Sequence, residues 1–272
     1  MRKSKFLQRK RQERQEESFI LKTADEILLM REANRLVAQA FARIGEMIKP
    51  GVVLRHVDEM VEAYIREQGG LPLYKGYRGS PPSHPPFPGV ICASVNSEIC
   101  HGFPDGRILR EGDIVGIDIG LRYHDFCGDS CVTYAVGEVK PAVRDFLRVA
   151  EECLYVGIQA AKVNSRLGEL GAAIQAHAEK HGYSVVQEYG GHGIGRALHE
   201  PLSVPHHGPA RYGPRLQPGM VFTIEPMVNM GKAKAELMPD GWTVKTVDGS
   251  LSAQYEHTIA ITENGPLILS VV

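Results

Sequence analysis

Apolar side chains recur at helical intervals near the start of the chain. Residues 23–26 read Thr-Ala-Asp-Glu, which is the form of a helix capping box, and apolar residues follow every three or four positions over 27–37. This pattern predicts a helix that ends near Ile48, before a Pro-Gly pair. The same spacing predicts a second helix over residues 54–67.

The rest of the chain alternates between short apolar runs and further helical patterns. Residues 71–89 are rich in proline and glycine, so we expect an irregular loop there. Apolar runs bounded by turn residues predict strands, and two regions with helical spacing lie among them. The predicted strands cover residues 90–95, 114–121, 129–135, 221–228, 242–247 and 252–262, and the predicted helices cover residues 141–163 and 167–180.

The order of these elements is helix–helix–sheet, followed by helix–helix–sheet. No repeat of individual residues accompanies this order. The order nevertheless predicts an α+β fold that consists of two similar halves.

The composition is that of an ordinary globular protein. The 272 residues contain 43% apolar and 23% charged side chains, with a formal net charge of −1. This balance gives no general attraction to nucleic acid or to an anionic membrane, and no apolar run approaches the roughly 20 residues of a membrane span. Five cysteines, an odd number without paired zinc spacing, are most simply free thiols in a reducing cytosol, so we expect a cytoplasmic protein.

Residues 1–20 form a distinct basic segment. The first 17 residues contain seven Lys or Arg against three Glu, and no apolar stretch follows them, which excludes a signal peptide. We expect a basic N-terminal arm that is mobile or helical. Two interpretations stay open, a solvated arm or an electrostatic contact with ribosomal RNA.

Acidic residues interrupt apolar strands at several places. Asp118 lies within IVGIDIGL, Glu225 lies within VFTIEPM, and Glu256 comes just before a strand that continues to IAI. An unpaired buried charge costs several kcal/mol. A satisfied polar group in the core could explain any one of these acids, but three of them favour a shared function.

Asp118 and Asp129 are expected to be neighbours. They lie 11 positions apart on two predicted strands, so an antiparallel hairpin would bring both side chains to one face. Two carboxylates this close repel each other unless a cation lies between them. With His192, Glu225 and Glu256 they make an oxygen-rich set that suits two hard or borderline divalent cations.

His192 lies among four glycines in the segment GGHGIG. The glycine spacing does not match a dinucleotide-binding loop, and the prolines that soon follow prevent the long helix that such a loop precedes. We expect the glycines to let the backbone pass close to a metal or a substrate. A zinc-binding helix of the His-Glu-x-x-His type is excluded. Such a motif that begins at His199 requires a histidine at position 203, which is occupied by Ser203.

Together these segments resemble the type I methionine aminopeptidases, which are pita-bread metallopeptidases. The similarity covers about residues 20–265, and the motifs CHGFP, GDIVGIDIG, GDS, GGHGIGRALHEP, FTIEPM, DGWTVKT and SAQYEHTI occur in the family's order. The resemblance implies a pita-bread fold with two pseudo-symmetric halves, in which helices back a curved antiparallel sheet. It also implies a single catalytic domain over residues 21–272.

The resemblance implies a role for each residue of the metal site. Asp118 would chelate one of two divalent metal ions, and Asp129 and Glu256 would bridge both. His192 and Glu225 would complete the other site. The metals, which are Co, Mn, Fe, Zn or Ni, would activate a water at neutral pH, and Glu225 would shuttle protons.

A second group of residues would face the substrate. His101 and His199 match the family's catalytic histidines, which bind the scissile peptide and its tetrahedral intermediate. The implied pocket residues are Tyr77, Phe87, Cys92, Leu198 and Trp242. The implied reaction removes the N-terminal methionine from nascent polypeptides and peptides with a small second residue, and we expect the enzyme to work as a monomer.

Two features place the chain within this family. The interval between His199 and Glu225 is short, whereas type II enzymes carry a large helical insertion there, and a missing N-terminal zinc-binding domain favours a bacterial-type enzyme. Two alternatives stay open: an X-Pro aminopeptidase or dipeptidase of the same fold, and a pita-bread protein that binds peptides or RNA without catalysis. The first usually has a large extra N-terminal domain, and the second typically lacks some metal ligands.

Overall fold

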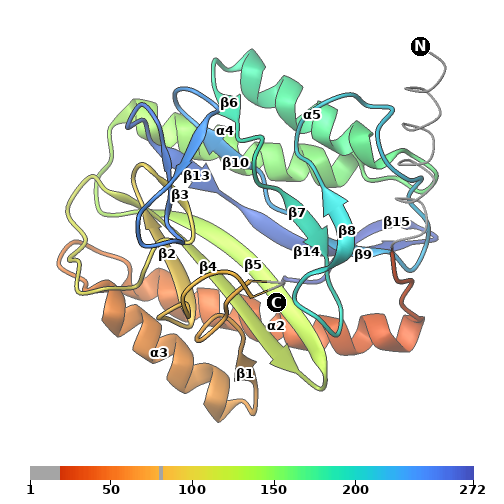
Figure 1. The fold of residues 1–272 in the computed structure, drawn as a ribbon, viewed down its shortest axis with the longest axis horizontal. Helices are drawn as coiled ribbons and strands as arrows, with labels where there is room; N and C mark the ends of the chain where they lie inside the picture. The colour runs from red at the N-terminus through yellow and green to blue at the C-terminus, as the bar shows by residue number, and fades with distance from the viewer. Residues whose placement is uncertain (1–18, 80–81) are drawn as a thin grey trace.

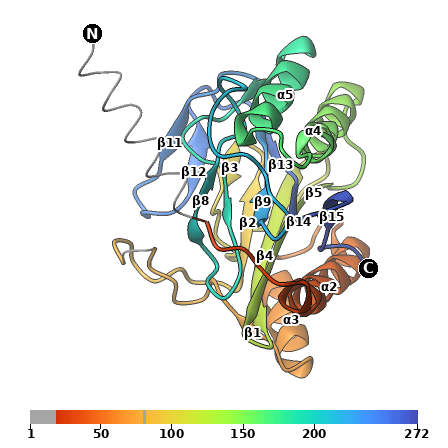
Figure 2. The same cartoon turned by 90° about the vertical axis from the view of Figure 1, so that its right-hand side faces the viewer.

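A computed structural model describes residues 19–79 and 82–272, and its four described helices lie on one side of a long antiparallel sheet (Figures 1 and 2). The basic arm predicted for residues 1–20 falls almost wholly outside the described residues and stays a prediction. Among the residues described, no helix combines the length and the apolar character needed to cross a lipid bilayer.

The helices begin and end close to their predicted limits. They are α2 (Ala24–Met47), α3 (Leu54–Glu67), α4 (Pro141–Ala160) and α5 (Leu167–Lys180). The capping box of α2 is confirmed, because Thr23 Oγ1 accepts from Glu26 N–H at 3.2 Å and Glu26 Oε2 accepts from Thr23 N–H at 3.0 Å. The prediction that α4 runs to residue 163 was wrong by three residues, since Ala161 already leaves the helical conformation.

The largest sheet among the described residues has nine strands, and every pairing in it is antiparallel. Its main path, in spatial order, is β1 (Leu71–Pro72), β4 (Ile114–Tyr123), β5 (Phe126–Ala135), β14 (Glu256–Thr262), β9 (Val221–Ile224), β7 (Gly191–Gly193) and β8 (Glu200–Val204). Strand β2 (Ile91–Val95) also pairs with β4, and β15 (Gly265–Ile268) pairs with β14.

Two smaller sheets adjoin the largest one. The first contains β13 (Ser252–Gln254), β10 (Met227–Asn229) and β6 (Ser184–Val185), and the second contains β11 (Ala235–Leu237), β12 (Val244–Thr246) and β3 (Glu98–Cys100). Apart from the two residues of β1, the described residues of the segment, 71–79 and 82–89, are irregular, as predicted.

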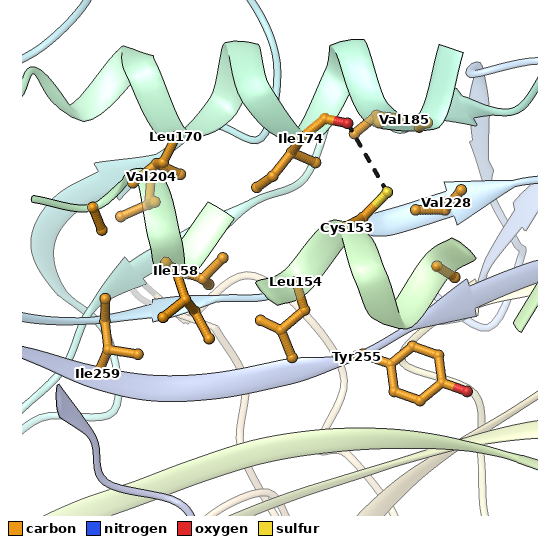
Figure 3. Packing of buried hydrophobic residues seen from close by; sticks show 14 of the residues in the cluster. Cys153, Leu154, Ile158, Leu170, Ile174, Val185, Val204, Val228, Tyr255 and Ile259 are labelled. Atoms are coloured by element: carbon orange, nitrogen blue, oxygen red, sulfur yellow. Dashed lines mark hydrogen bonds between the residues drawn. The ribbon is translucent and has the colours of Figure 1, made fainter. Parts of the chain in front are cut away.

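Two hydrophobic cores lie between the helices and the sheet. One core contains apolar residues of α2 and α3 packed on β2 and β4. The other contains apolar residues of α4 and α5 packed on β9 and β14, and Figure 3 shows part of it around Leu154, Ile158 and Ile174. Each core thus joins one helix pair to one half of the sheet, which confirms the prediction of two similar halves.

Two of the predicted strands are each broken into two. Residues 221–228 divide into β9 and β10 around Glu225 and Pro226, and residues 252–262 divide into β13 and β14 at Tyr255. Proline has no N–H group for the sheet ladder, so the strand cannot continue through Pro226. At both breaks the chain passes between the largest sheet and a smaller one.

We predict that Leu154→Ala lowers the free energy of unfolding by about 2–5 kcal/mol, because this side chain is 2% exposed and its removal leaves a cavity between α4 and the sheet. Urea denaturation followed by circular dichroism measures the change. Gln159→Ala, on the exposed face of the same helix, is the matched control and should change stability by less than about 0.5 kcal/mol. Equal losses in both variants would contradict this packing.

Candidate active site

Five neighbouring strands of the largest sheet each bring one of the predicted metal ligands to a common point. The strands are β4, β5, β14, β9 and β7, in that spatial order. The residues, here called the metal-site cluster, are Asp118 on β4, Asp129 on β5, Glu256 at the start of β14, Glu225 directly after β9, and His192 on β7. The strand order therefore gathers residues that are far apart in the sequence.

The hairpin of β4 and β5 brings its two aspartates together, as predicted. Asp129 pairs directly with Gly120, which lies two positions after Asp118. The two aspartates are therefore offset by two positions, and their side chains lie on the same face of the hairpin. A two-residue turn of His124 and Asp125, with φ of 47° and 65°, connects the strands. Positive φ at both central residues is typical of the mirror-image turns of hairpins, whose twist matches the right-handed twist of the two flanking strands.

The orientation of the His192 imidazole is fixed by a hydrogen bond to the backbone of the next residue. Its Nδ1 lies 3.0 Å from the carbonyl oxygen of Gly193, which can only accept, so Nδ1 carries the proton and Nε2 keeps its lone pair. Nε2 lies 3.6 Å from Asp129 Oδ2 and 3.7 Å from Glu225 Oε1. This is the arrangement expected of a histidine that ligates a metal shared with carboxylates.

Thr223 connects His192 to Glu225. Its Oγ1 accepts from the backbone N–H of His192 at 3.0 Å and donates to Glu225 Oε1 at 2.8 Å. Gln254 Nε2 donates to the other oxygen of Glu225 at 3.2 Å. Both oxygens of this carboxylate are thus held in place by neighbouring side chains.

The glycines around His192 allow β7 to lie between β8 and β9. A methyl group on Gly191 would lie 2.3 Å from the carbonyl oxygen of Thr223 on β9, and one on Gly193 would lie 3.2 Å from Leu202 on β8. Gly190 and Gly191 also line the cavity. Close approach of the backbone to a metal or a substrate stays a prediction.

The electrostatics of the metal-site cluster disfavour four uncompensated negative charges. Asp129, Glu225 and Glu256 are 3%, 7% and 2% exposed. Burial raises the pKa of all four carboxyl groups of the cluster, and repulsion by neighbouring carboxylates raises the pKa of Asp129 and Glu256 further. Four carboxylates and one neutral imidazole form a donor set that suits divalent cations, so the cluster fits a metal centre.

Burial also keeps the histidines of the site neutral. It lowers the pKa of His192 to about 3 and that of His101 to about 4, and it lowers the pKa of His199. Neutral imidazoles can ligate a metal or donate a hydrogen bond near pH 7.

A cavity of about 540 Å³ opens above the metal-site cluster. All the residues predicted to face the substrate line it: Tyr77, Phe87, Cys92, His101, Leu198, His199 and Trp242. The ring of His199 lies 4.2 Å from that of His192, and the ring of His101 lies 6.0 Å from that of Trp242. The cavity therefore has a polar floor and a largely aromatic wall.

Trp242 is held by the proline-rich loop. Its Nε1 donates to the carbonyl oxygen of Pro85 at 2.8 Å, and the ring of His84 lies 4.7 Å from its ring. On the cavity side the ring of Phe87 lies 5.4 Å away, and that of Tyr77 lies 6.1 Å away. The loop thus supplies residues that line the cavity, and it also holds the Trp242 ring in place.

Three residues of the site were missed by sequence reasoning. Tyr74 O–H lies 2.6 Å from Asp118 Oδ1 and 2.7 Å from Asp129 Oδ1 and lines the cavity. Tyr74 belongs to the irregular loop, where no periodic pattern indicates the direction of a side chain. Thr223 could have been found, because residues two apart on a strand share a face and Thr223 precedes Glu225 by two. Gln254 carries the same signal, because it precedes Glu256 by two within the predicted strand 252–262.

Comparison with known proteins identifies the class. The chain belongs to metallopeptidase family M24, whose model matches residues 28–263. Membership of this family implies that the chain binds divalent metal, and the metal-site cluster supplies ligands of the required type.

Within that family the chain is similar to methionine aminopeptidases, which confirms the resemblance. It is 47% identical over 253 residues to methionine aminopeptidase 1 of Bacillus subtilis, an alignment that covers 93% of this chain and 99% of the relative. It is 44% identical over 253 residues to the methionine aminopeptidase of Escherichia coli, covering 92% of this chain and 93% of the relative.

Solved structures support the same grouping. The methionine aminopeptidase of Rickettsia prowazekii superposes with a TM-score of 0.89 at 37% identity, covering 93% of this chain and all of that one. Prolidase from Pyrococcus furiosus gives a TM-score of 0.69 at 23% identity, and the match covers 93% of this chain and 66% of that one, which shows a shared fold alone. The pita-bread fold is thereby confirmed.

We predict that Glu256→Gln changes how the metal-free protein responds to pH. The pKa of Glu256 is raised by burial above its unfolded value, so the stability this group contributes is full below the unfolded pKa and is lost as pH rises. Glutamine stays neutral throughout. In EDTA, wild type should therefore lose stability relative to the variant as pH rises above about 5, by up to about 1.4 kcal/mol per pH unit. Urea denaturation at several pH values measures this, and a constant difference would contradict it.

Proposed function

We propose that this protein is a metal-dependent aminopeptidase that removes the N-terminal methionine from nascent proteins and peptides, with preference for a small second residue. The observation that carries the proposal is the metal-site cluster at the floor of an aromatic cavity that His101 and His199 also line. Similarity to methionine aminopeptidases over 93% of the chain supports the same activity.

We propose two divalent metal ions for each chain, of the Co, Mn, Fe, Zn or Ni type. Asp118 would hold one ion, His192 and Glu225 would hold the other, and Asp129 and Glu256 would be shared by both. When bound, such ions supply Lewis-acid activation of a water and of the scissile carbonyl. The four carboxylates support this stoichiometry, because a single divalent cation would leave much of their buried negative charge unbalanced.

Glu225 is the proposed proton shuttle of the reaction. In the metal-free cluster its pKa is raised to about 8 by burial, with repulsion from Asp118 adding to the effect, and bound cations would lower this pKa toward the range in which Glu225 accepts a proton as a base. The hydrogen bonds from Thr223 and Gln254 keep its carboxylate in one orientation while it does so. A fixed orientation matters, because proton transfer requires hydrogen-bond distance to the reacting group.

His199 is the proposed donor to the oxyanion, and Tyr77 sets its tautomer. Burial raises the pKa of Tyr77, so its hydroxyl stays protonated and can donate to His199 Nδ1, 3.0 Å away. That leaves Nε2 of His199 as the N–H group, which can donate to the developing negative charge. His101 is proposed to bind the scissile peptide from the Trp242 side of the cavity.

The cavity wall accounts for the choice of methionine. Its proposed lining consists of Tyr77, Phe87, Cys92, Leu198 and Trp242, which are aromatic, aliphatic or thiol side chains. An unbranched thioether packs well on aromatic rings and fills an irregular apolar space. The substrate side chain therefore gains both burial and sulfur–aromatic contacts.

The setting of the activity is also proposed. We infer a cytoplasmic, monomeric enzyme, and the five cysteines support a reducing compartment because each is free and buried. The basic N-terminal arm would bring the enzyme to nascent chains through a contact with the ribosome.

We predict that the metal-loaded protein hydrolyses Met-Ala-Ser faster than Ala-Pro-Ala, and that Asp118→Ala loses all measurable turnover while it keeps its circular dichroism spectrum. The loss follows because Asp118 is a proposed metal ligand. Chromatographic detection of released methionine or alanine measures both results. Faster cleavage of Ala-Pro-Ala would reject the proposal in favour of an X-Pro enzyme, and normal turnover by Asp118→Ala would reject the metal centre.

We predict that His199→Ala lowers kcat by roughly two to four orders of magnitude, which is the usual effect of losing an oxyanion or acid–base group. Steady-state hydrolysis of Met-Ala-Ser measures the change. Tyr77→Phe keeps the aromatic wall and removes only the hydroxyl near His199, so its loss should be smaller. A loss of less than about tenfold in His199→Ala would exclude the oxyanion role.

A further inference from the structure

A second group of metal-ligating side chains lies outside the cavity, on the pair of helices α4 and α5. It consists of Glu152 on α4, His177 on α5 and His181 directly after the last residue of α5, here called the helix-pair cluster. None of the three lines the cavity above the metal-site cluster. The proposed reaction gives them no role.

The spacing of the helix-pair cluster suits coordination of a single ion. One ligand atom from each residue lies within 4.8 Å of the others. His177 Nε2 is 3.1 Å from Glu152 Oε2, and the rings of His177 and His181 are 4.7 Å apart. Residues four apart on a helix share a face, so both imidazoles point to the side where α4 passes.

Hydrogen bonds already orient two of the three ligands. His181 Nδ1 is 2.9 Å from the carbonyl oxygen of His177, so Nδ1 carries the proton and Nε2 has a free lone pair. Arg148 binds Oε1 of Glu152, and this contact also lowers the pKa of the carboxyl group, which leaves Oε2 charged and directed at His177. A backbone acceptor behind one ligating imidazole and a fixed carboxylate are the supports typical of metal sites.

We propose that Glu152, His177 and His181 bind one zinc-class divalent cation, separate from the metal centre of the cavity. Two imidazoles and one carboxylate are a common donor set for zinc, with ligand atoms about 3.4 Å apart around a tetrahedral ion. Small rotations of these partly exposed side chains would bring the ligand atoms to this separation. Water completes the coordination on the solvent side.

Binding at the helix-pair cluster would connect α4 to α5. These helices pack on each other and on β9 and β14 in the core shown in Figure 3. A cation that binds only the folded arrangement raises the stability of the protein by mass action. The site therefore stabilises the half of the fold that carries His192, Glu225 and Glu256, without contact with the substrate.

The test counts zinc ions in metal-free protein returned to Zn²⁺ by equilibrium dialysis. Wild type should bind one more zinc per chain than His177→Ala or His181→Ala, because the metal centre of the cavity contributes equally to all three proteins. His56→Ala, an exposed histidine on α3, is the matched control and should bind as many ions as wild type. Equal zinc counts in all four proteins would overturn the proposal.

Thermal unfolding gives an independent result. Added Zn²⁺ should raise the Tm of wild type and of His56→Ala by more than it raises the Tm of His181→Ala. Turnover of Met-Ala-Ser should be the same in wild type and His181→Ala, since this residue lies outside the cavity. Glu152→Gln keeps both histidines and should bind the additional zinc more weakly than wild type. An equal Tm increase in all of these proteins would contradict a site that connects the helices.

Discussion

The gathering of four carboxylates at one point is the constraint on which the rest of this structure depends. Asp118, Asp129, Glu225 and Glu256 meet at the floor of the cavity, where the last three are buried, and removal from bulk water raises the pKa of every one of them. Such a group persists in a folded protein only when cations balance the charge or when protons neutralise it. The choice between cations and protons links the electrostatics of the site to its chemistry.

The fold fixes these charges in place through the order of its strands. Each of five neighbouring strands supplies one residue, so no loop has to reach across the site. Glu225 and Glu256 lie where the chain passes between the largest sheet and a smaller sheet, and such a corner directs a side chain out of the regular ladder. The four described helices lie on one side of the sheet (Figure 2), and no residue of these helices lines the cavity.

Local patterns explain which parts of this arrangement the sequence predicted. Asp118 and Asp129 were placed together because one hairpin determines their register, and a hairpin depends on neighbouring residues. The helices were predicted because their apolar spacing and the Thr23 capping box are local signals. Pro226 also carried a local signal for the break in the strand after Glu225, although residues 221–228 were predicted as one strand.

Other features depend on contacts between distant segments. The position of β14 between β5 and β9 sets the distance from Glu256 to Asp129, and no local pattern encodes it. Tyr74 reaches the aspartates from an irregular loop. The glycines beside His192 are visible in the sequence, but their close packing against the adjacent strands is not. Sequence thus indicated the chemistry, and tertiary packing determined its geometry.

The central claim is that two cations share the metal-site cluster, with Asp129 and Glu256 between them. The most direct measurement is anomalous diffraction from crystals of the protein grown with Mn²⁺. The account predicts two anomalous peaks inside the cluster, with the carboxylates of Asp129 and Glu256 each touching both. A single peak, or two peaks that these carboxylates do not bridge, would contradict it.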